Sequence, residues 1–205
     1  MNNTLMEQKK ALSRLWNLFS ALFCQPEADV HGDKKVYDEL VQSLQILDKE
    51  IINDAKSLLK HYESAGQQSV LIEYTRLFIG PFKTVAPPYS SVYLSNDGTV
   101  FGQATLWVIE FYRNSGLEVN YSTNEVPDHI SIELEFMHFL SAQEIVEIES
   151  GNFEKAKLLF NLQEVFLNQH LKVWCPMFCD RIITGTENDY YRKLSICFKN
   201  YLEKI

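Results

Sequence analysis

The chain has 205 residues, of which 46% are hydrophobic and 13% aromatic. This length fits one domain better than two, and the apolar fraction is enough to fill a hydrophobic core. The formal net charge is −8, from 27 acidic and 19 basic residues. Such a balance argues against binding to the phosphates of nucleic acids, which needs clustered Lys and Arg, and it favours a basic partner.

Cysteine usage and hydropathy indicate the compartment. The four cysteines are Cys24, Cys175, Cys179 and Cys197. They do not make a disulfide framework in a chain of this length, which points to a reducing environment. No apolar run reaches the roughly 18 residues of a membrane span. Arg14 and Asn17 interrupt the apolar segment near the N-terminus, and no small-residue cleavage site follows it. We therefore expect a soluble, cytoplasmic protein.

Apolar residues recur at helical spacing over the first 80 positions. They predict helices at residues 4–24, 36–47, 51–65 and 69–79. Pro26 and a polar loop at 27–34 separate the first two, and Gly66 separates the last two. Gly80-Pro81 ends the fourth helix, because Gly suits the position after a helix and Pro cannot continue one.

The helical pattern resumes near Gln103. It predicts further helices at residues 103–116, 124–148, 153–170, 174–184 and 189–205, whereas residues 117–123 alternate loosely and could be extended. About eight or nine helices with one long loop predict an all-α fold in a single globular domain. The loop at 80–102 divides the helices into an N-terminal set (1–80) and a C-terminal set (103–205), so it is also a candidate hinge.

That central loop is the strongest anomaly in the sequence. Its first half is rich in prolines and apolar side chains: Phe82, Val85, Pro87, Pro88, Tyr89, Val92 and Tyr93. Lys83 is the single charge among them. A connection of this length is uncommon in a compact domain and is suspected of function. One interpretation is a structural lid that prolines stiffen, and the other is a preformed apolar groove for a peptide.

Asp128 and His129 form a second candidate site at the start of a predicted helix. An Asp there can accept from free backbone N–H groups and complements the helix dipole, and the same dipole disfavours the charged form of His129. One interpretation is a helix cap beside a half-exposed imidazole. The other is a polar pair that faces a ligand, with Asp128 accepting from a guanidinium or a backbone N–H.

Other chemistry finds little support. His129 and Glu133 have the i, i+4 spacing of metal ligands, but no Cys or second His completes the set, and His138 points elsewhere. Cys175 and Cys179 fit neither a redox motif nor a zinc site, so we expect two reduced, partly buried thiols. The sequence contains no phosphate-binding glycine motif and no nucleophile elbow. We therefore expect no metal, no cofactor and no enzymatic activity.

Several segments carry a resemblance to a known family. They are Leu77-Phe78-Ile79-Gly80-Pro81, Ala86-Pro87-Pro88-Tyr89-Ser90-Ser91-Val92-Tyr93, Phe101-Gly102, Pro127-Asp128-His129, Glu133-Leu134, Phe136-Met137, Phe166, His170-Leu171, Trp174, Pro176 and Phe178. In this order they resemble the Tor/Dms/Nar family of redox enzyme maturation chaperones, in particular its trimethylamine N-oxide and dimethyl sulfoxide reductase branches. The matches span residues 73–178.

The resemblance implies a cytoplasmic chaperone in anaerobic respiration. Such a protein binds the twin-arginine signal peptide of a molybdoenzyme precursor and delays export until the molybdopterin cofactor is inserted. The resemblance assigns peptide binding to Tyr74, Leu77, Phe78, Pro88, Tyr89, Asp128 and His129. Tyr74 and Tyr89 stand where the dimethyl sulfoxide reductase branch tends to have Trp, and both keep an aromatic face.

Alternatives come with the same resemblance. The family includes proposals of guanine-nucleotide binding, so a weak nucleotide-binding or hydrolysing protein is one alternative. A structural assembly subunit retained with the mature reductase is another. The long central loop also permits a domain-swapped dimer in place of a monomer.

A composite peptide site fits the charge and the loop. A twin-arginine peptide has a basic start, which a chain of net charge −8 attracts, and then an apolar stretch. We expect Asp128, together with Glu133, to meet an arginine. We expect the apolar stretch to lie against Leu77, Phe78, Pro88 and Tyr89.

Overall fold

The computed structural model describes residues 3–47, 51–80, 84–95, 98–117 and 126–205. Its α helices are α1 (Asn3–Leu22), α2 (Ala28–His31), α3 (Lys34–Leu47), α4 (Ile52–Ala65), α5 (Gln67–Tyr74), α6 (Ser90–Leu94), α7 (Gln103–Asn114), α8 (Ile130–Glu149), α9 (Phe153–Phe166), α10 (Lys172–Gly185) and α11 (Asp189–Lys204). There are also two π-helical turns: η1 (Thr75–Ile79) extends the end of α5, and η2 (Leu167–Leu171) joins α9 to α10. Strand pairing in the described ranges is limited to one isolated β-bridge. The all-α prediction is therefore confirmed.

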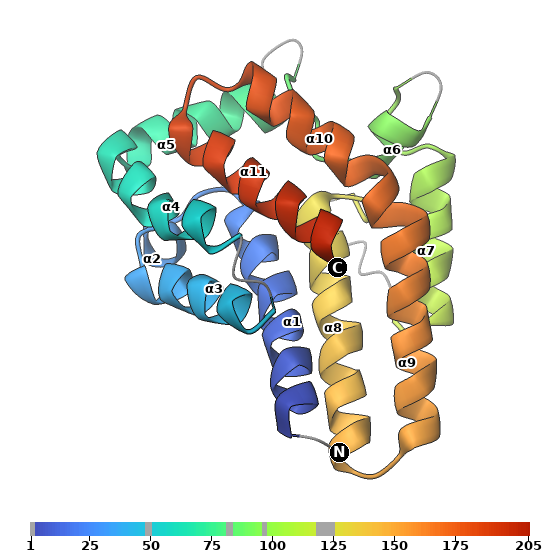
Figure 1. Ribbon diagram of the computed structural model, residues 1–205. Helices are drawn as coiled ribbons and strands as arrows, with labels where there is room; N and C mark the ends of the chain where they lie inside the picture. Colours follow the sequence, from blue (N-terminus) through green and yellow to red (C-terminus); the bar gives the residue numbers. More distant parts are fainter. Residues whose placement is uncertain (1–2, 48–50, 81–83, 96–97, 118–125) are drawn as a thin grey trace.

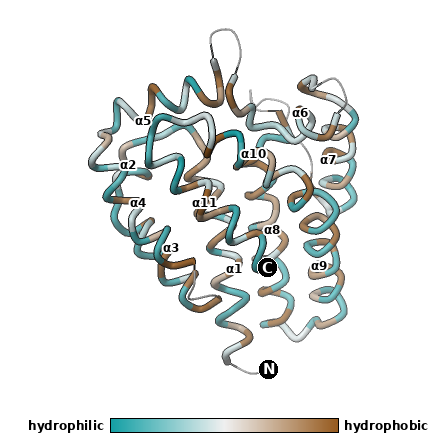
Figure 2. The backbone as a smooth tube through the Cα atoms, turned by 45° about the horizontal axis from the view of Figure 1, so that its top comes forward, coloured by the Kyte–Doolittle hydropathy of each residue, from teal (hydrophilic) through white to brown (hydrophobic). Residues whose placement is uncertain are grey.

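Helices α1, α8 and α9 lie side by side, and α10 and α11 cross above them (Figure 1). On the other side of α1, helix α3 packs against α1 and α4, and α4 packs against α11. Figure 2 shows hydrophobic and hydrophilic stretches alternating along α1, α3 and α9, as expected for helices that bury one face. None of the helices in the described ranges is long and apolar enough to cross a membrane.

Aromatic side chains form the centre of the core between α1, α10 and α11. The apolar stripe of α1 places Trp16 5.2 Å from the ring of Tyr201, and Phe19 5.0 Å from that of Phe198. Phe23 at the end of this stripe contacts Phe198 and Phe178, with ring centroids 5.2 and 5.6 Å apart. The apolar residues whose helical spacing predicted these helices are thus the residues that the helices bury against one another.

Two segments expected to be loops contain short helices. Helix α2 interrupts the polar stretch at 27–34, and α6 lies inside the long central loop. Four and five residues are too few for apolar residues to show a helical period, so the pattern could not reveal them. The helix expected from 124 begins at Ile130. The extended stretch considered at 117–123 lies, except for Leu117, outside the described residues.

The expected break between 170 and 174 is absent. Helix α9 continues through η2 directly into α10, so the path from Phe153 to Gly185 is helical throughout. Pro176 is near the start of the helix expected at 174–184, yet it lies inside α10, which begins at Lys172. There it removes the hydrogen bond that an N–H would make to the carbonyl of Lys172. The wider turn η2 comes just before that site.

Candidate functional site

The central loop and the start of α8 are joined directly. Ser90 N donates to the carbonyl of Asp128 at 3.0 Å, and Ile130 N donates to that of Pro88 at 2.8 Å. This antiparallel bridge pairs Tyr89 with His129, and the two rings are 5.4 Å apart. The two segments that the sequence suggested for one composite site are therefore adjacent.

A cavity of about 290 Å³ lies beside this bridge. Its lining residues are Cys24, Gln25, Glu27, Tyr74, Phe78, Ile79, Pro88, Tyr89, His129 and Ser131. Of the seven site residues expected from the sequence, five line it: Tyr74, Phe78, Pro88, Tyr89 and His129. The other two, Leu77 and Asp128, are fully buried and do not line it.

The turn η1 explains why Tyr74 and Phe78 line the cavity while Leu77, between them in sequence, lies in the core. Helix α5 widens here into a π turn, which rotates the residues that follow relative to a regular α-helix. Tyr74 and Phe78 contact each other edge to face at 5.0 Å and line the cavity, while Leu77 points into the core. Ile79, 56% exposed, stands at the rim. Gly80 ends the turn with φ 57°, a conformation that favours glycine.

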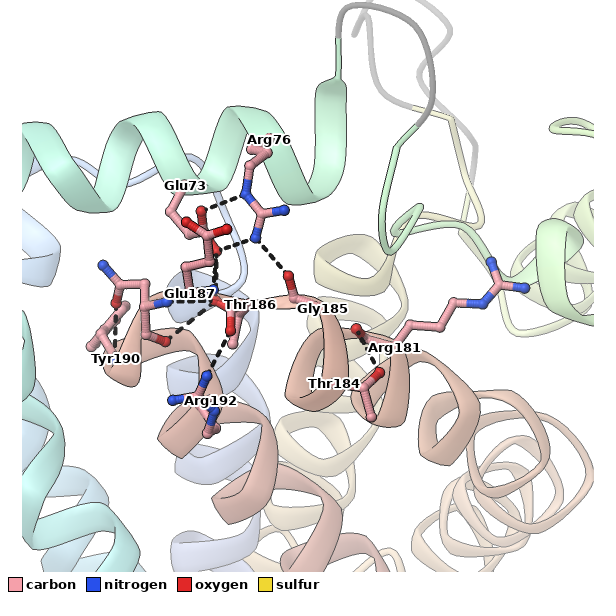
Figure 3. Close-up of polar contacts among 10 residues, drawn as sticks. Glu73, Arg76, Arg181, Thr184, Gly185, Thr186, Glu187, Tyr190 and Arg192 are labelled. Carbon is pink, nitrogen blue, oxygen red and sulfur yellow. Dashed lines mark hydrogen bonds and ion pairs between the residues drawn. The ribbon is translucent and has the colours of Figure 1, made fainter.

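A polar cluster fastens η1 to the turn between α10 and α11 (Figure 3). Arg76 forms a bidentate pair with the carboxylate of Glu73, at 2.7 and 2.8 Å, and also donates to the carbonyl of Gly185. The same carboxylate accepts from Thr186 Oγ1 at 2.6 Å and from Glu187 N at 3.0 Å. Burial opposes ionisation of Glu73, but these hydrogen bonds outweigh it and lower its pKa. The cluster thus holds the turn that carries Phe78.

Asp128 caps a different helix from the one expected. Its Oδ2 accepts from the backbone N–H of Ser91 at 2.8 Å, in the first turn of α6. Helix α8 is capped instead by His129, whose Nδ1 accepts from Ser131 N at 3.2 Å. Asp128 is 0% exposed, so it holds α6 in place behind the cavity. The expectation that its carboxylate meets an arginine does not fit this position.

His129 is buried rather than half-exposed, with 4% of its surface accessible. Burial lowers its pKa to about 4, and the charge of Asp128 opposes this shift only in part. The expected direction was right, but the main cause is loss of solvent rather than the helix dipole. Because Ser131 N can only donate, Nδ1 accepts, and the proton of the neutral ring lies on Nε2. The cavity wall at His129 is therefore uncharged at neutral pH.

Glu133 also lies behind the site, with no exposed surface. It accepts from His170 Nε2 at 2.7 Å and from Trp174 Nε1 at 2.9 Å, which tie η2 and α10 to α8. Burial raises its pKa, and His170 acts in the opposite direction. The expected contact of Glu133 with an arginine is thus excluded in this conformation, because its carboxylate is enclosed and already paired.

The candidate metal ligands and the paired cysteines of the sequence lie in packed parts of the helices. Within the described residues, no group of three or more His, Cys, Asp and Glu could hold a metal ion. His138 lies further along α8 than His129, and its Nδ1 is 2.9 Å from the carbonyl of Ser13 on α1. Cys175 and Cys179 are free thiols, fully rather than partly buried, and burial raises the pKa of both.

Sequence reasoning missed one wall of the cavity. Cys24, Gln25 and Glu27 come from the corner between α1 and α2, within and just before a stretch that reads as an ordinary polar loop. Only packing of α1 against α8 brings this corner opposite the central loop. The wall adds a carboxylate to a cavity that is otherwise aromatic, apolar or neutral. Such a site can hold an apolar side chain or a cationic one.

Comparisons with known proteins place the chain in a family. The family model described as nitrate reductase delta subunit matches residues 37–180. The chain is 28% identical to the Tat proofreading chaperone DmsD of Salmonella typhi over 148 residues, which are 72% of this chain and 64% of the relative. It is 30% identical to the chaperone protein TorD of Vibrio vulnificus over 139 residues, 65% of this chain and 62% of the relative. Against the perchlorate reductase assembly chaperone of Dechloromonas aromatica it is 28% identical over 190 residues, 84% and 78% of the two chains.

A solved structure is similar as well. The crystal structure of a candidate redox enzyme maturation protein from Archaeoglobus fulgidus matches with a TM-score of 0.60 and 26% identity, over 94% of each chain. The matched part covers just under two thirds of the DmsD and TorD relatives. This chain belongs to the nitrate reductase delta subunit family. The resemblance to the Tor/Dms/Nar maturation chaperones is thereby confirmed.

Proposed function

We propose that this protein is a cytoplasmic chaperone for the maturation of a molybdoenzyme of the dimethyl sulfoxide or trimethylamine N-oxide reductase type. It binds the twin-arginine signal peptide of the precursor in the cavity between η1, the central loop and the start of α8. Binding delays export until the molybdopterin cofactor is inserted. Relatives named as a Tat proofreading chaperone, DmsD, and as a chaperone protein, TorD, support this assignment.

The lining of the cavity is the observation that carries the proposal. Tyr74, Phe78 and Tyr89 supply aromatic surface, and the ring of Pro88, with its fixed φ, adds a stiff apolar surface beside the extended backbone of Tyr89. Rigid rings and prolines offer apolar area at a low entropic cost of binding. At about 290 Å³ the cavity is at the small end of ligand pockets, which run from about 300 to 1,000 Å³. It therefore suits a few side chains of a peptide that lies across it.

A nucleotide-hydrolysing function fits this cavity less well. The one ionised side chain in its lining is the carboxylate of Glu27, which would repel a triphosphate. The neutral ring of His129 adds no compensating charge. An assembly subunit retained with the mature reductase remains the second candidate for the binding role. A stoichiometric complex co-purified with the mature, cofactor-loaded enzyme favours that reading, and a complex found only with the precursor favours a transient chaperone.

Calorimetric titration with a twin-arginine signal peptide tests the peptide site. Tyr89→Ala removes a half-buried ring of the cavity, and we expect the Kd to rise at least about tenfold, which corresponds to about 1.4 kcal/mol. Phe153→Ala is the matched control, because Phe153 is 61% exposed at the start of α9. Equal affinities of wild type and Tyr89→Ala, with both folded by circular dichroism, would remove the cavity from the binding site.

A further inference from the structure

The cavity contains one group that can pair with a cation. Of its ten lining residues, only Glu27 carries a charge at neutral pH, since the ring of His129 is neutral there. Asp128 and Glu133 are fully buried and do not line the cavity. Asp128 Oδ2 accepts from Ser91 N, while its Oδ1 is enclosed without a partner among the described residues, and Glu133 is paired with His170 and Trp174. A basic side chain that enters the cavity therefore meets the carboxylate of Glu27.

The backbone of Glu27 is held firmly at this corner. His31, 1% exposed, accepts from Glu27 N through Nδ1 at 3.3 Å, and its Nε2 lies 3.3 Å from the carbonyl of Leu22. The ring thus bridges the end of α1 and the start of α2. Tyr37 Oη donates to the carbonyl of His31 at 2.8 Å and fixes the corner from α3. Pro26, just before Glu27, further restricts the chain.

The side chain of Glu27, by contrast, belongs to an exposed residue. Within the described part of the chain its carboxylate acts on His31 through its charge and forms no hydrogen bond or ion pair. An acceptor that is fixed at its backbone, open at its head and placed beside aromatic rings suits a guanidinium. The planar fork of arginine can bind a carboxylate through two parallel hydrogen bonds and can lie flat on an aromatic face. The ammonium of lysine keeps the charge but cannot form the fork.

We infer that Glu27 is the residue that binds an arginine side chain of the peptide, with the guanidinium beside the rings of Tyr74, Phe78 and Tyr89. This inference rests on the proposed peptide-binding function and replaces Asp128 as the acidic partner. Binding of the arginine at Glu27 puts the basic start of the peptide at the α1–α2 corner. The apolar stretch then follows along Pro88 and Tyr89.

A double-mutant cycle measured by calorimetry tests the pairing. The probes are a synthetic twin-arginine signal peptide and variants in which each arginine is replaced by Gln or by Lys. We expect Glu27→Gln to raise the Kd of the parent peptide about tenfold. For one of the two Arg→Gln peptides, Glu27→Gln should leave the Kd unchanged. The corresponding Arg→Lys peptide should lose part of the affinity with wild type and little more with Glu27→Gln.

Asp29→Asn supplies the control, because Asp29 lies on α2, two residues after Glu27, is exposed and does not line the cavity. Equal weakening by Asp29→Asn and Glu27→Gln would mean a general charge effect and would overturn the pairing. If Tyr89→Ala weakens binding of the peptide and Glu27→Gln does not, the assignment of the arginine to Glu27 is wrong, while the assignment of the peptide to the cavity holds. If the parent peptide does not bind wild type at all, the proposed function and this inference both fall.

Discussion

At the scale of single residues, the site separates side chains that line the cavity from side chains that support it. His129 does both, because its ring faces the cavity and also caps α8 through Nδ1. Asp128, its neighbour in sequence, contributes only support, by capping α6. Spacing along a chain cannot tell these roles apart, since both residues have the same polar character and lie just before the same helix.

The buried ring of His129 predicts a dependence of stability on pH. Its pKa falls from the ordinary value of 6.5 to about 4 in the folded protein. Between these values the unfolded chain binds a proton that the folded chain does not, so this contribution is complete above pH 6.5 and is lost as the pH falls towards 4. The expected loss is about 3 kcal/mol in the free energy of unfolding.

Urea unfolding from pH 7 to pH 4 checks this for wild type and His129→Asn. Asn can still cap α8 but does not titrate, so the variant should lose less stability over this window. His61→Asn changes a half-buried histidine of α4 and serves as control. If the free energy of unfolding falls with pH equally for wild type and His129→Asn, the ring of His129 titrates in the folded protein as it does in the unfolded chain.

At the scale of elements, close packing at the end of α10 sets the position of the central loop. A Cβ atom on Gly185 would lie 2.3 Å from Cγ1 of Val85, which is far inside contact distance. Val85 precedes Pro88 by three residues, so its placement against this glycine also positions the wall of the cavity. The glycine is needed here for the close approach of two segments that are distant in sequence.

Gly185→Ala should therefore both destabilise the protein and weaken peptide binding. We expect a cost of about 1–3 kcal/mol, because Val85 is β-branched and must move with its backbone. The double variant with Val85→Ala should recover part of that cost, which thermal unfolding can measure. Gly102→Ala is the control, since a Cβ there would meet atoms no nearer than 3.9 Å. Additive costs for the two changes at 85 and 185 would argue against the steric conflict.

The long helices could be predicted from the sequence, and the short and widened elements could not. Apolar residues at helical spacing and the break at Gly66 mark α3 and α4 closely, and the same spacing places the end of α8 and the start of α9. The π turns leave no sign, because η1 keeps apolar residues where an α-helix would also have them. At the site, aromatic and proline residues identified the loop wall, and the position of His129 at a predicted helix start, together with the resemblance, identified that residue. The wall at Glu27 depends on packing of distant helices, which one sequence does not reveal.

At the scale of the whole molecule, net charge should govern how fast a basic peptide arrives. The chain carries −8 in formal charge, and a field of this sign raises the association rate of a cationic ligand. Salt screens that field beyond about 8–10 Å at 0.1–0.15 M.

Stopped-flow fluorescence with a labelled twin-arginine peptide measures the effect. The association rate constant should fall about tenfold or more between ~20 and ~500 mM salt, while the dissociation rate constant changes less. A peptide in which both arginines are replaced by Gln should show a much weaker dependence. If the two peptides respond to salt alike, electrostatic attraction does not guide binding.

The cavity draws its lining from residues 24 to 131, but part of its support comes from later in the chain. Phe78 packs on Phe178 and Tyr191, with ring centroids 5.8 and 5.6 Å apart, and Arg76 reaches the carbonyl of Gly185. During synthesis, every lining residue therefore leaves the ribosome before α10 and α11, which hold Phe78 and η1 in place. For the proposed function, this order predicts that a newly made chain gains a fully supported peptide site only after α10 and α11 have been translated and have docked.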